Sequence, residues 1–202
     1  CIRDRSWAFD PGVFQFSFDP AKAQALLDEA GYRDPDGAGP EPRLRLSLKV
    51  STNEFIRLQA AVIQQDLKQV GIELDVRSYE FATLYADVLK GNFQLFTLQW
   101  VGVSDPDMLR RVFHSQQMPP NGFNRGYYQN AEVDRLIDAA MAATTDADRR
   151  RLYADAQRVI AEDAPYISLW YKTNVAVSRT QIEGVKLTPS ADFTFLRDVT
   201  KH

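Results

Sequence analysis

The sequence predicts an α/β fold in which helices cover a sheet, and three observations indicate this class. The chain has 202 residues, 45% of them hydrophobic, enough for one large domain or one domain with an appendage. Residues 44–80 show a strand, a helix and a second strand with short links, a unit whose crossover favours parallel, right-handed pairing. A further helix and an apolar run over 81–101 repeat the pattern.

The lead-in, residues 1–18, begins the chain with many aromatic side chains and no helical period. It therefore predicts a loop-like segment that packs on the rest of the protein. Asp19 and Pro20 are the residue types of a helix N-cap and first turn, and the helix that they begin should end at Gly31. A loop rich in proline and glycine follows over 34–42.

The central region alternates strands and helices. Residues 44–51 and 72–80 alternate apolar and polar side chains, as half-buried strands do, and the segment 54–70 between them has a helical period. A second helix is expected over 81–89. The run that follows, 93–101, is so apolar that we expect a strand buried on both faces. The apolar stripe of the helix over 54–70 consists of Phe55, Leu58, Ala61, Val62, Leu67 and Val70.

The last part of the chain is mainly helical. We expect a short helix over 107–113, a surface loop over 115–130, and an antiparallel helical pair over 131–143 and 146–164. Residues 166–179 predict one or two strands. The tail beyond them has short apolar runs without a complete core pattern, so we expect it to dock elsewhere.

The composition limits the classes of function. A formal charge of -3 lacks the excess of lysine and arginine that nucleic-acid binding requires, so we expect no nucleic-acid partner. One cysteine excludes an intrachain disulfide, and with two histidines it cannot supply the usual ligands of structural zinc. We expect no metal and no cofactor, although a carboxylate-rich calcium site stays open in principle. No run approaches the ~20 apolar residues of a membrane-spanning helix.

Catalytic motifs are scarce in this sequence, which contains no nucleotide-binding glycine loop and no zinc-protease motif. A small hydrolase would have to use His114 with Ser104 or Asp105. A histidine at a helix end is more often a capping or packing residue. Asp105 has a simple structural interpretation too, as an N-cap with Pro106 at the first helical position.

A binding site is predicted beyond the carboxyl end of the apolar run, where ligands of open α/β sheets lie. Trp100 offers a flat apolar face with one N–H donor, although a ring that merely closes the core fits equally well. Asn124 and Arg125, in the following loop, offer amide and guanidinium donors to a carboxylate or carbonyl group. The alternative is that both are solvated loop residues.

Four blocks of the sequence occur in a fixed order, namely FDPAKAQALLDEAGY, GNFQLFTLQWVGVSDPDMLRRVFHS, NRGYYQNAEVDRLIDAA and EDAPYISLWY. Together they resemble the carboxyl-terminal half of the family 5 extracellular solute-binding proteins, the dipeptide, oligopeptide and nickel receptors of ABC transporters. The resemblance covers the chain from Phe18 onward. It implies a lobe of the type II periplasmic binding protein architecture, a mixed sheet flanked by helices, as a fragment of a two-lobed receptor.

The resemblance also implies a division of the chain and a set of partners. Residues 1–18 would pack on the lobe, 19–177 would form the carboxyl-terminal lobe, and 178–202 would return toward the missing amino-terminal lobe. A receptor of this kind captures a peptide or similar small solute and delivers it to ABC-transporter permease subunits, without catalysis. It would lie in the periplasm or at the extracellular face of the bacterial inner membrane. Membrane contact would run only through the permease or a lipid anchor; Cys1 could carry a lipid but fits better as a free cysteine.

One position departs from the family pattern. In peptide-binding members an Asp shortly after the Trp of this block pairs with the amino terminus of the ligand. Val103 stands three positions after Trp100, so the carboxylate is lacking or has moved to Asp105. Val103 would suit a less charged ligand, whereas Asp105 could meet an amine or hydroxyl through a remodelled loop. Nickel chelates, oligosaccharides and opines stay open as ligands.

A third interpretation is a stand-alone interaction module, in which the aromatic lead-in is a partner surface. Both a missing lobe and a missing partner predict a contiguous apolar patch over the lead-in and the tail.

Overall fold

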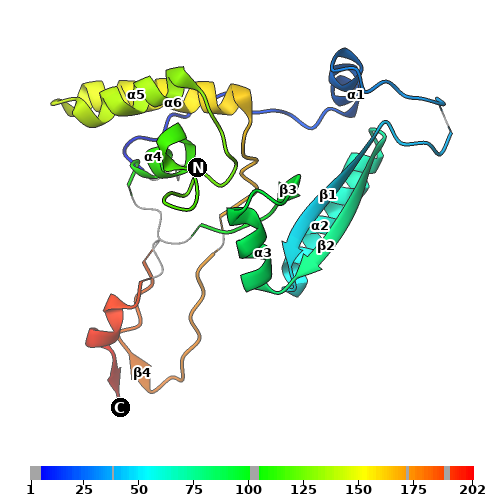
Figure 1. Ribbon diagram of the computed structural model, residues 1–202. Helices are drawn as coiled ribbons and strands as arrows, with labels where there is room; N and C mark the ends of the chain where they lie inside the picture. The colour runs from blue at the N-terminus through cyan, green and yellow to red at the C-terminus, as the bar shows by residue number, and fades with distance from the viewer. Residues whose placement is uncertain (1–5, 38, 101–104, 172, 189–191) are drawn as a thin grey trace. The chain divides into compact units, whose positions relative to one another are not determined.

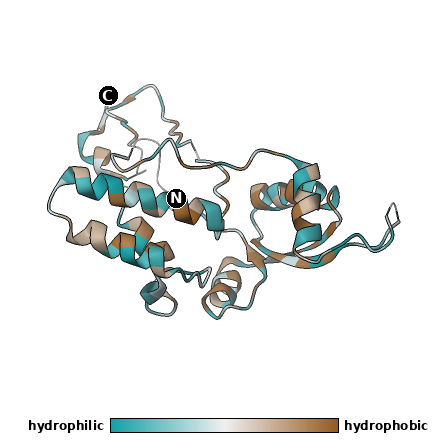
Figure 2. Cartoon of the chain, turned by 90° about the horizontal axis from the view of Figure 1, so that it is seen from above, coloured by the Kyte–Doolittle hydropathy of each residue, from teal (hydrophilic) through white to brown (hydrophobic). Residues whose placement is uncertain are grey.

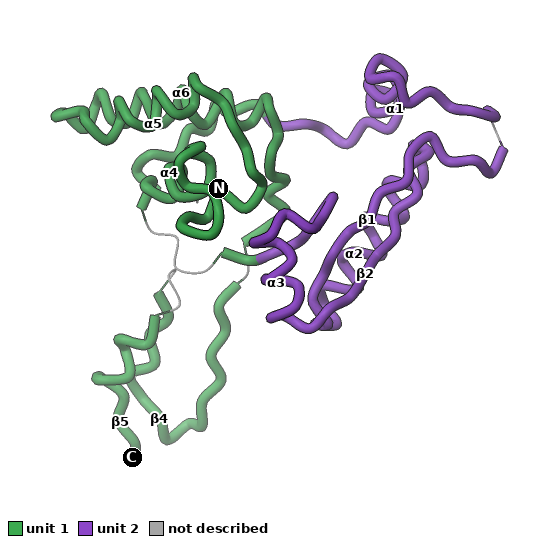
Figure 3. Tube along the Cα trace, in the orientation of Figure 1, with its two compact units in different colours: residues 1–14, 99–202 green, residues 15–98 purple. Residues whose placement is uncertain are grey.

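The computed structural model describes residues 6–37, 39–100, 105–171, 173–188 and 192–202. The chain divides into two compact units, one comprising Cys1–Phe14 with Gln99–His202 and the other Gln15–Leu98 (Figure 3). We call them unit 1 and unit 2. The sequence analysis did not predict this division, because the two segments of unit 1 are far apart in the chain.

Unit 2 is built on a parallel sheet. β1 (Leu44–Ser51) pairs in parallel with β2 (Ile72–Tyr79) on one side and with β3 (Leu95–Phe96) on the other, so the order is β2-β1-β3. α2 (Glu54–Lys68) connects β1 to β2, and α3 (Phe81–Leu89) connects β2 to β3 (Figure 1). The predicted strand–helix–strand unit and its parallel pairing are confirmed.

The core of unit 2 lies between α2 and the sheet. Because side chains alternate along a strand, every second residue of β1 and β2 faces the helix. The buried residues are Leu48, Val50, Ala60 and Leu74, with Ile56, Ile63 and Leu67 packed against them. The predicted α2 stripe was partly wrong, since Phe55, Leu58 and Val62 are 60, 63 and 61% exposed. Ile56, Ala60, Ile63 and Leu67, which also recur at helical spacing, face the sheet instead.

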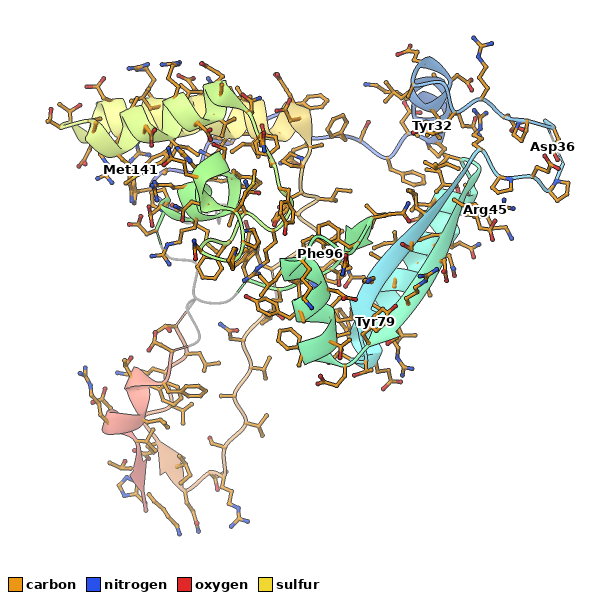
Figure 4. All side chains as sticks on the ribbon, viewed as in Figure 1. Tyr32, Asp36, Arg45, Tyr79, Phe96 and Met141 are labelled. Carbon is orange, nitrogen blue, oxygen red and sulfur yellow. The ribbon has the colours of Figure 1, made fainter. Side chains whose placement is uncertain are left out.

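The opposite face of this sheet is polar. Arg45 lies toward one end of the strands and Tyr79 at the other (Figure 4). The Nε of Arg45 lies 2.7 Å from a carboxylate oxygen of Glu73. Lys49 Nζ lies 2.6 Å from a carboxylate oxygen of Asp87 on α3, so α3 is linked to this face by an ion pair.

The prediction of a long buried strand over 93–101 was wrong. Among the described residues of this run, 93–100, only Leu95 and Phe96 pair with β1, and Leu95 is 38% exposed. The Gln94 side chain explains where the pairing starts, because its Oε1 accepts hydrogen bonds of 2.8 Å from both the backbone N–H and the hydroxyl of Ser47. A side chain thus takes the position that a backbone carbonyl would occupy in a longer ladder.

α1 (Pro20–Glu29) has the predicted ends. The Asp19 carboxylate accepts a hydrogen bond of 2.9 Å from the Lys22 N–H, and Gly31 has a positive φ of 91° just beyond the helix. None of the ten residues of α1 is buried. Its apolar stripe therefore contributes little to the core of unit 2.

Unit 1 contains the predicted short helix and helical pair, α4 (Met108–Phe113), α5 (Ala131–Ala142) and α6 (Asp146–Asp163). α5 and α6 lie side by side (Figure 1), and apolar and polar residues alternate along both (Figure 2). The lead-in packs here, because Ala8 is buried and Trp7 and Phe9 contact the same core. The buried residues are Ala8, Leu109, Val112, Phe113, Val133, Leu136, Ile137, Ala140, Tyr153, Ala156 and Ile160.

The expected strands over 166–179 were wrong for the described residues of that segment, none of which lies in a strand. Strand-like alternation forms a ladder only where a second strand is available to pair with it. The tail forms a small antiparallel ribbon of β4 (Ile182–Glu183) and β5 (Thr200–Lys201), with the 3₁₀ helix η2 (Thr194–Asp198). The sheet of unit 2 is parallel throughout, so antiparallel pairing occurs only in this separate ribbon among the described strands.

Several aromatic and aliphatic residues of the lead-in and tail are exposed. Phe16 and Phe18 are 58 and 76% exposed, and Phe193 and Leu196 are 73 and 58% exposed. These fractions agree with the expected apolar surface, while its continuity stays a prediction.

Candidate ligand-binding site

Trp100 and Arg125, two of the predicted site residues, lie together in unit 1. The guanidinium carbon of Arg125 is 4.5 Å from the centroid of the Trp100 ring and 5.3 Å from that of Phe123. The two rings meet edge to face, with centroids 6.0 Å apart and planes at 80°. At these distances the ring electrons attract the guanidinium charge. We call Trp100, Phe123 and Arg125 the aromatic–arginine cluster.

The three members of the cluster differ in exposure. Arg125 is 7% exposed and Trp100 is half-buried, whereas Phe123 is 40% exposed. Tyr166 is a further neighbour: burial raises the pKa of its hydroxyl, and the nearby charge of Arg125 opposes that rise. The sequence analysis missed Phe123. Its place in the same loop, two residues before Arg125, is the signal that could have identified it.

Asn124 is fully buried, and its amide is occupied inside the protein. Its Nδ2 donates to the backbone carbonyls of His114, at 3.2 Å, and Tyr128, at 2.7 Å. Its Oδ1 accepts from the Tyr128 N–H at 3.0 Å. The amide therefore fixes the loop that carries Arg125, a different task from the direct ligand contact predicted for it.

Asp105 is exposed to solvent and forms a turn. Its Oδ1 accepts a hydrogen bond of 2.9 Å from the Asp107 N–H, and α4 begins only at Met108. The expected helix start at Pro106 was therefore wrong, because the Asp105 side chain closes a turn before the helix instead of capping its first residue. Val103 and Ser104 lie outside the described residues.

His114 has no access to a solvent-borne substrate, since it is 1% exposed. Its Nδ1 accepts a hydrogen bond of 3.1 Å from the Gln116 N–H, and its Nε2 lies 3.2 Å from a carboxylate oxygen of Asp138. A neutral imidazole in this setting carries its proton on Nε2. The adjacent hydroxyl, that of Ser115, bonds to the Asp134 carboxylate. This geometry is typical of the capping and packing role, not of a general base.

The Tyr128 hydroxyl continues the polar network at the end of the loop. It hydrogen-bonds to the Asp163 carboxylate, which also accepts a bond of 2.7 Å from Asn130 Nδ2. Burial, followed by the bond to Asp163, raises the pKa of Tyr128. The loop is thus held at both ends, by α6 and by the segment after α4.

Within the described ranges, no group of three or more His, Cys, Asp and Glu side chains could hold a metal ion. A search of the same ranges finds no helix that combines the length and the apolar character needed to cross a membrane.

Comparisons with known proteins agree with the sequence blocks. Residues 2–120 match the family described as bacterial extracellular solute-binding proteins, family 5 middle. The oligopeptide-binding protein AppA of Bacillus subtilis is 31% identical over 196 residues, which are 93% of this chain and 36% of that protein. The glutathione-binding protein GsiB of Salmonella choleraesuis is 32% identical over 197 residues, 94% of this chain and 37% of that protein. The chain therefore spans little more than a third of the length of these relatives.

Solved structures show the same fold. The structure of Bacillus subtilis AppA in complex with a nonapeptide has a TM-score of 0.84 at 28% identity and covers 98% of this chain, which corresponds to 40% of that one. The structure of the Escherichia coli murein tripeptide-binding protein MppA has a TM-score of 0.79 at 23% identity. The match covers 98% of this chain and 38% of the MppA chain. The relatives are solute-binding proteins and not enzymes, so they support the receptor interpretation and not the hydrolase.

Proposed function

Because the chain belongs to the family 5 bacterial extracellular solute-binding proteins, we propose that it is part of the substrate-binding component of an ABC importer. The full-length protein would capture a solute between two lobes that close by a hinge motion, and would deliver it to the permease subunits. Residues 19–177 would form one lobe, on which 1–18 packs, and 178–202 would return toward the amino-terminal lobe.

The aromatic–arginine cluster is the observation that carries this proposal. Trp100 would form a packing wall for the solute, and Arg125 would be the polar group beside it. Asp105, exposed to solvent, would meet an amine or hydroxyl, while Val103 would suit a less charged group. Asn124 would act through the loop by keeping Arg125 against Trp100.

Peptides and peptide-like compounds are the solutes that we propose. The names of the relatives that share about a third of their residues with this chain refer to oligopeptides and glutathione, at 31 and 32% identity. The importer would work at the periplasmic or extracellular face of the bacterial inner membrane. Its membrane contact would run through the permease or a lipid anchor.

Thermal unfolding of the full-length protein with candidate solutes tests the function. Di- and oligopeptides, glutathione, sugars and nickel–histidine would be compared. A solute at a hundredfold excess over its Kd should stabilise the full-length protein by about 2.7 kcal/mol. This chain alone should show much less stabilisation, because binding sites enclose ~70–90% of a small ligand. Stabilisation by no solute class would contradict the proposal.

Trp100→Ala in the full-length protein tests the cluster itself. Removing the ring should weaken solute binding by about tenfold or more, because a buried aromatic wall contributes on the order of 1–3 kcal/mol. Leu58→Ala is a matched control, since Leu58 is 63% exposed on α2. Isothermal titration calorimetry gives both affinities, and equal Kd values for parent and Trp100→Ala would remove Trp100 from the site.

A further inference from the structure

We infer that Asn121 is a site of spontaneous deamidation, and that the folded loop between α4 and α5 slows this reaction. Asparagine is one of the chemically labile residues of proteins. Asn121 is exposed to solvent and is followed by Gly122. A glycine has no Cβ, so its backbone nitrogen is the least hindered in an attack on the side chain before it.

The reaction has two steps, and water is its only co-reactant. The backbone nitrogen of Gly122 forms a bond to the Cγ atom of Asn121 and loses its proton, while the side-chain nitrogen takes that proton and leaves as ammonia. The product is a five-membered cyclic imide. Water then opens the imide at one carbonyl to give aspartate, or at the other to give isoaspartate, whose backbone is longer by one carbon atom.

Ring formation has to break a hydrogen bond of the folded loop. The Gly122 N–H donates to the Met118 carbonyl at 3.0 Å. The imide nitrogen carries no hydrogen, so this bond is lost when the ring closes. The loss of one such bond should slow the reaction by roughly twofold to tenfold, and a carbonyl left without a partner should slow it further.

Close packing also holds Gly122 in place. A Cβ atom at this position would lie 2.1 Å from the Gln117 carbonyl oxygen, so the Gly122 backbone lies directly against that carbonyl. The same carbonyl accepts a hydrogen bond of 2.7 Å from the Asn124 N–H. The Gly122 nitrogen can therefore turn toward the Asn121 side chain only when the loop opens. Packing requires the glycine that makes Asn121 labile, and the same packing restrains the nitrogen that would attack.

The protection matters because of what lies next to it. Asn121 is two residues before Phe123, a member of the aromatic–arginine cluster. Aspartate at position 121 would leave the backbone intact, whereas isoaspartate would add one backbone atom to the turn that closes between Met118 and Gly122. We expect the longer backbone to disturb the loop that carries the cluster.

The test measures deamidation of Asn121 in the full-length protein, by peptide mapping and mass spectrometry after incubation at mildly alkaline pH. The native protein should react about tenfold or more slowly than the same protein unfolded in guanidinium chloride. Asn124→Ala removes the side-chain bonds to His114 and Tyr128, so the loop should open more often and the native rate should rise severalfold. Leu48→Ala is a control that weakens the core of unit 2 and should leave the native rate unchanged.

Two further variants keep the test decisive. Gly122→Ala, measured in guanidinium chloride, should slow the reaction severalfold, because a Cβ atom hinders the attacking nitrogen. Tyr128→Phe removes only the bond to Asp163 and replaces Asn124→Ala if that variant does not fold. An unfolded protein that keeps its amide at position 121 would overturn the modification site. Equal rates in the native and unfolded protein would overturn the protection, as would equal native rates for the parent and the loop variant.

Discussion

At position 124 a fully buried amide makes three hydrogen bonds to the backbone of His114 and Tyr128. A buried group of this kind is costly to leave without partners, because it loses its bonds to water on folding. The Asn124 amide uses both of its N–H groups and its oxygen, so the site depends on a residue that is itself inaccessible to solvent.

Asn124→Asp is the sharpest substitution at this scale, since it keeps the shape but turns the Nδ2 donor into an acceptor. A carboxylate would then face two backbone carbonyls, which should lower the free energy of unfolding by on the order of 2–4 kcal/mol. Urea denaturation followed by circular dichroism measures this loss. Asn121→Asp, an exposed position in the same loop, should change stability by less than about 0.5 kcal/mol. Equal losses in the two variants would show that the Asn124 bonds contribute nothing.

The sequence predicted part of this arrangement. Trp100 and Arg125 were both expected at the site, because a tryptophan at the carboxyl end of an apolar run and an arginine in the next loop supply the needed chemistry. Their contact at 4.5 Å and the inward direction of Asn124 were not predictable. Both depend on the packing of a loop against α4 and α5, which no local pattern encodes.

At the scale of elements, side-chain caps define where the helices begin. Thr145 Oγ1 accepts a hydrogen bond of 3.1 Å from the Asp148 N–H at the start of α6 and donates one of 2.7 Å to the Asp148 carboxylate. The bond from Thr145, followed by that from Arg151, lowers the pKa of Asp148 from its ordinary value of 3.8. This acid thus contributes stability above its unfolded-state pKa, and the contribution is lost as the pH falls through the folded-state pKa.

Thr145→Ala should therefore lower the free energy of unfolding by about 1 kcal/mol at pH 7, the usual contribution of an N-cap. The difference in free energy of unfolding between variant and parent should narrow as the pH falls from 3.8 through the lower folded-state pKa of Asp148, because protonation of the carboxylate weakens its bond from Thr145. Chemical denaturation at several pH values gives the loss in free energy of unfolding and its dependence on pH. Thr145→Ser keeps the hydroxyl and should behave like the parent; a penalty independent of pH would contradict the role of Asp148.

Elements with strong local signals were predictable, and elements that depend on partners were not. β1, α2 and β2 follow alternation and helical periods, so their bounds agree with the sequence within a few residues. The segments 93–101 and 166–179 have strand-like composition, yet only Leu95 and Phe96 pair with another strand in the described parts of these segments. Amino-acid composition indicates a propensity to form a strand, whereas hydrogen-bonded pairing also requires a second strand close by.

At the scale of the whole molecule, the two units have separate hydrophobic cores. Leu48 belongs to the core of unit 2 and Leu109 to that of unit 1, and they are 3 and 1% exposed. Each core is formed by the elements of its own unit. The family and the fold class were predictable from four ordered blocks. The two-unit division was not, because it joins residues 1–14 to residues about a hundred positions later in the sequence.

Leu48→Ala and Leu109→Ala should each cost about 2–5 kcal/mol, the range for a buried leucine that leaves a cavity. We expect the effects to be local. Hydrogen exchange measured by mass spectrometry should show lower protection over 44–79 for Leu48→Ala and over 108–163 for Leu109→Ala. Loss of protection throughout the chain in both variants would show a single cooperative unit instead.

The segment 166–171, YISLWY, has a consequence for the isolated chain. It contains no charged residue and no proline, and it is rich in residues that favour strands. Ile167 and Trp170 are 82 and 54% exposed. Short uncharged windows of this kind template edge-to-edge association between copies and can seed cross-β aggregates. Tyr166 already packs against the core of unit 1, so the tendency of the isolated chain to aggregate depends on whether another surface covers the exposed residues 167–171.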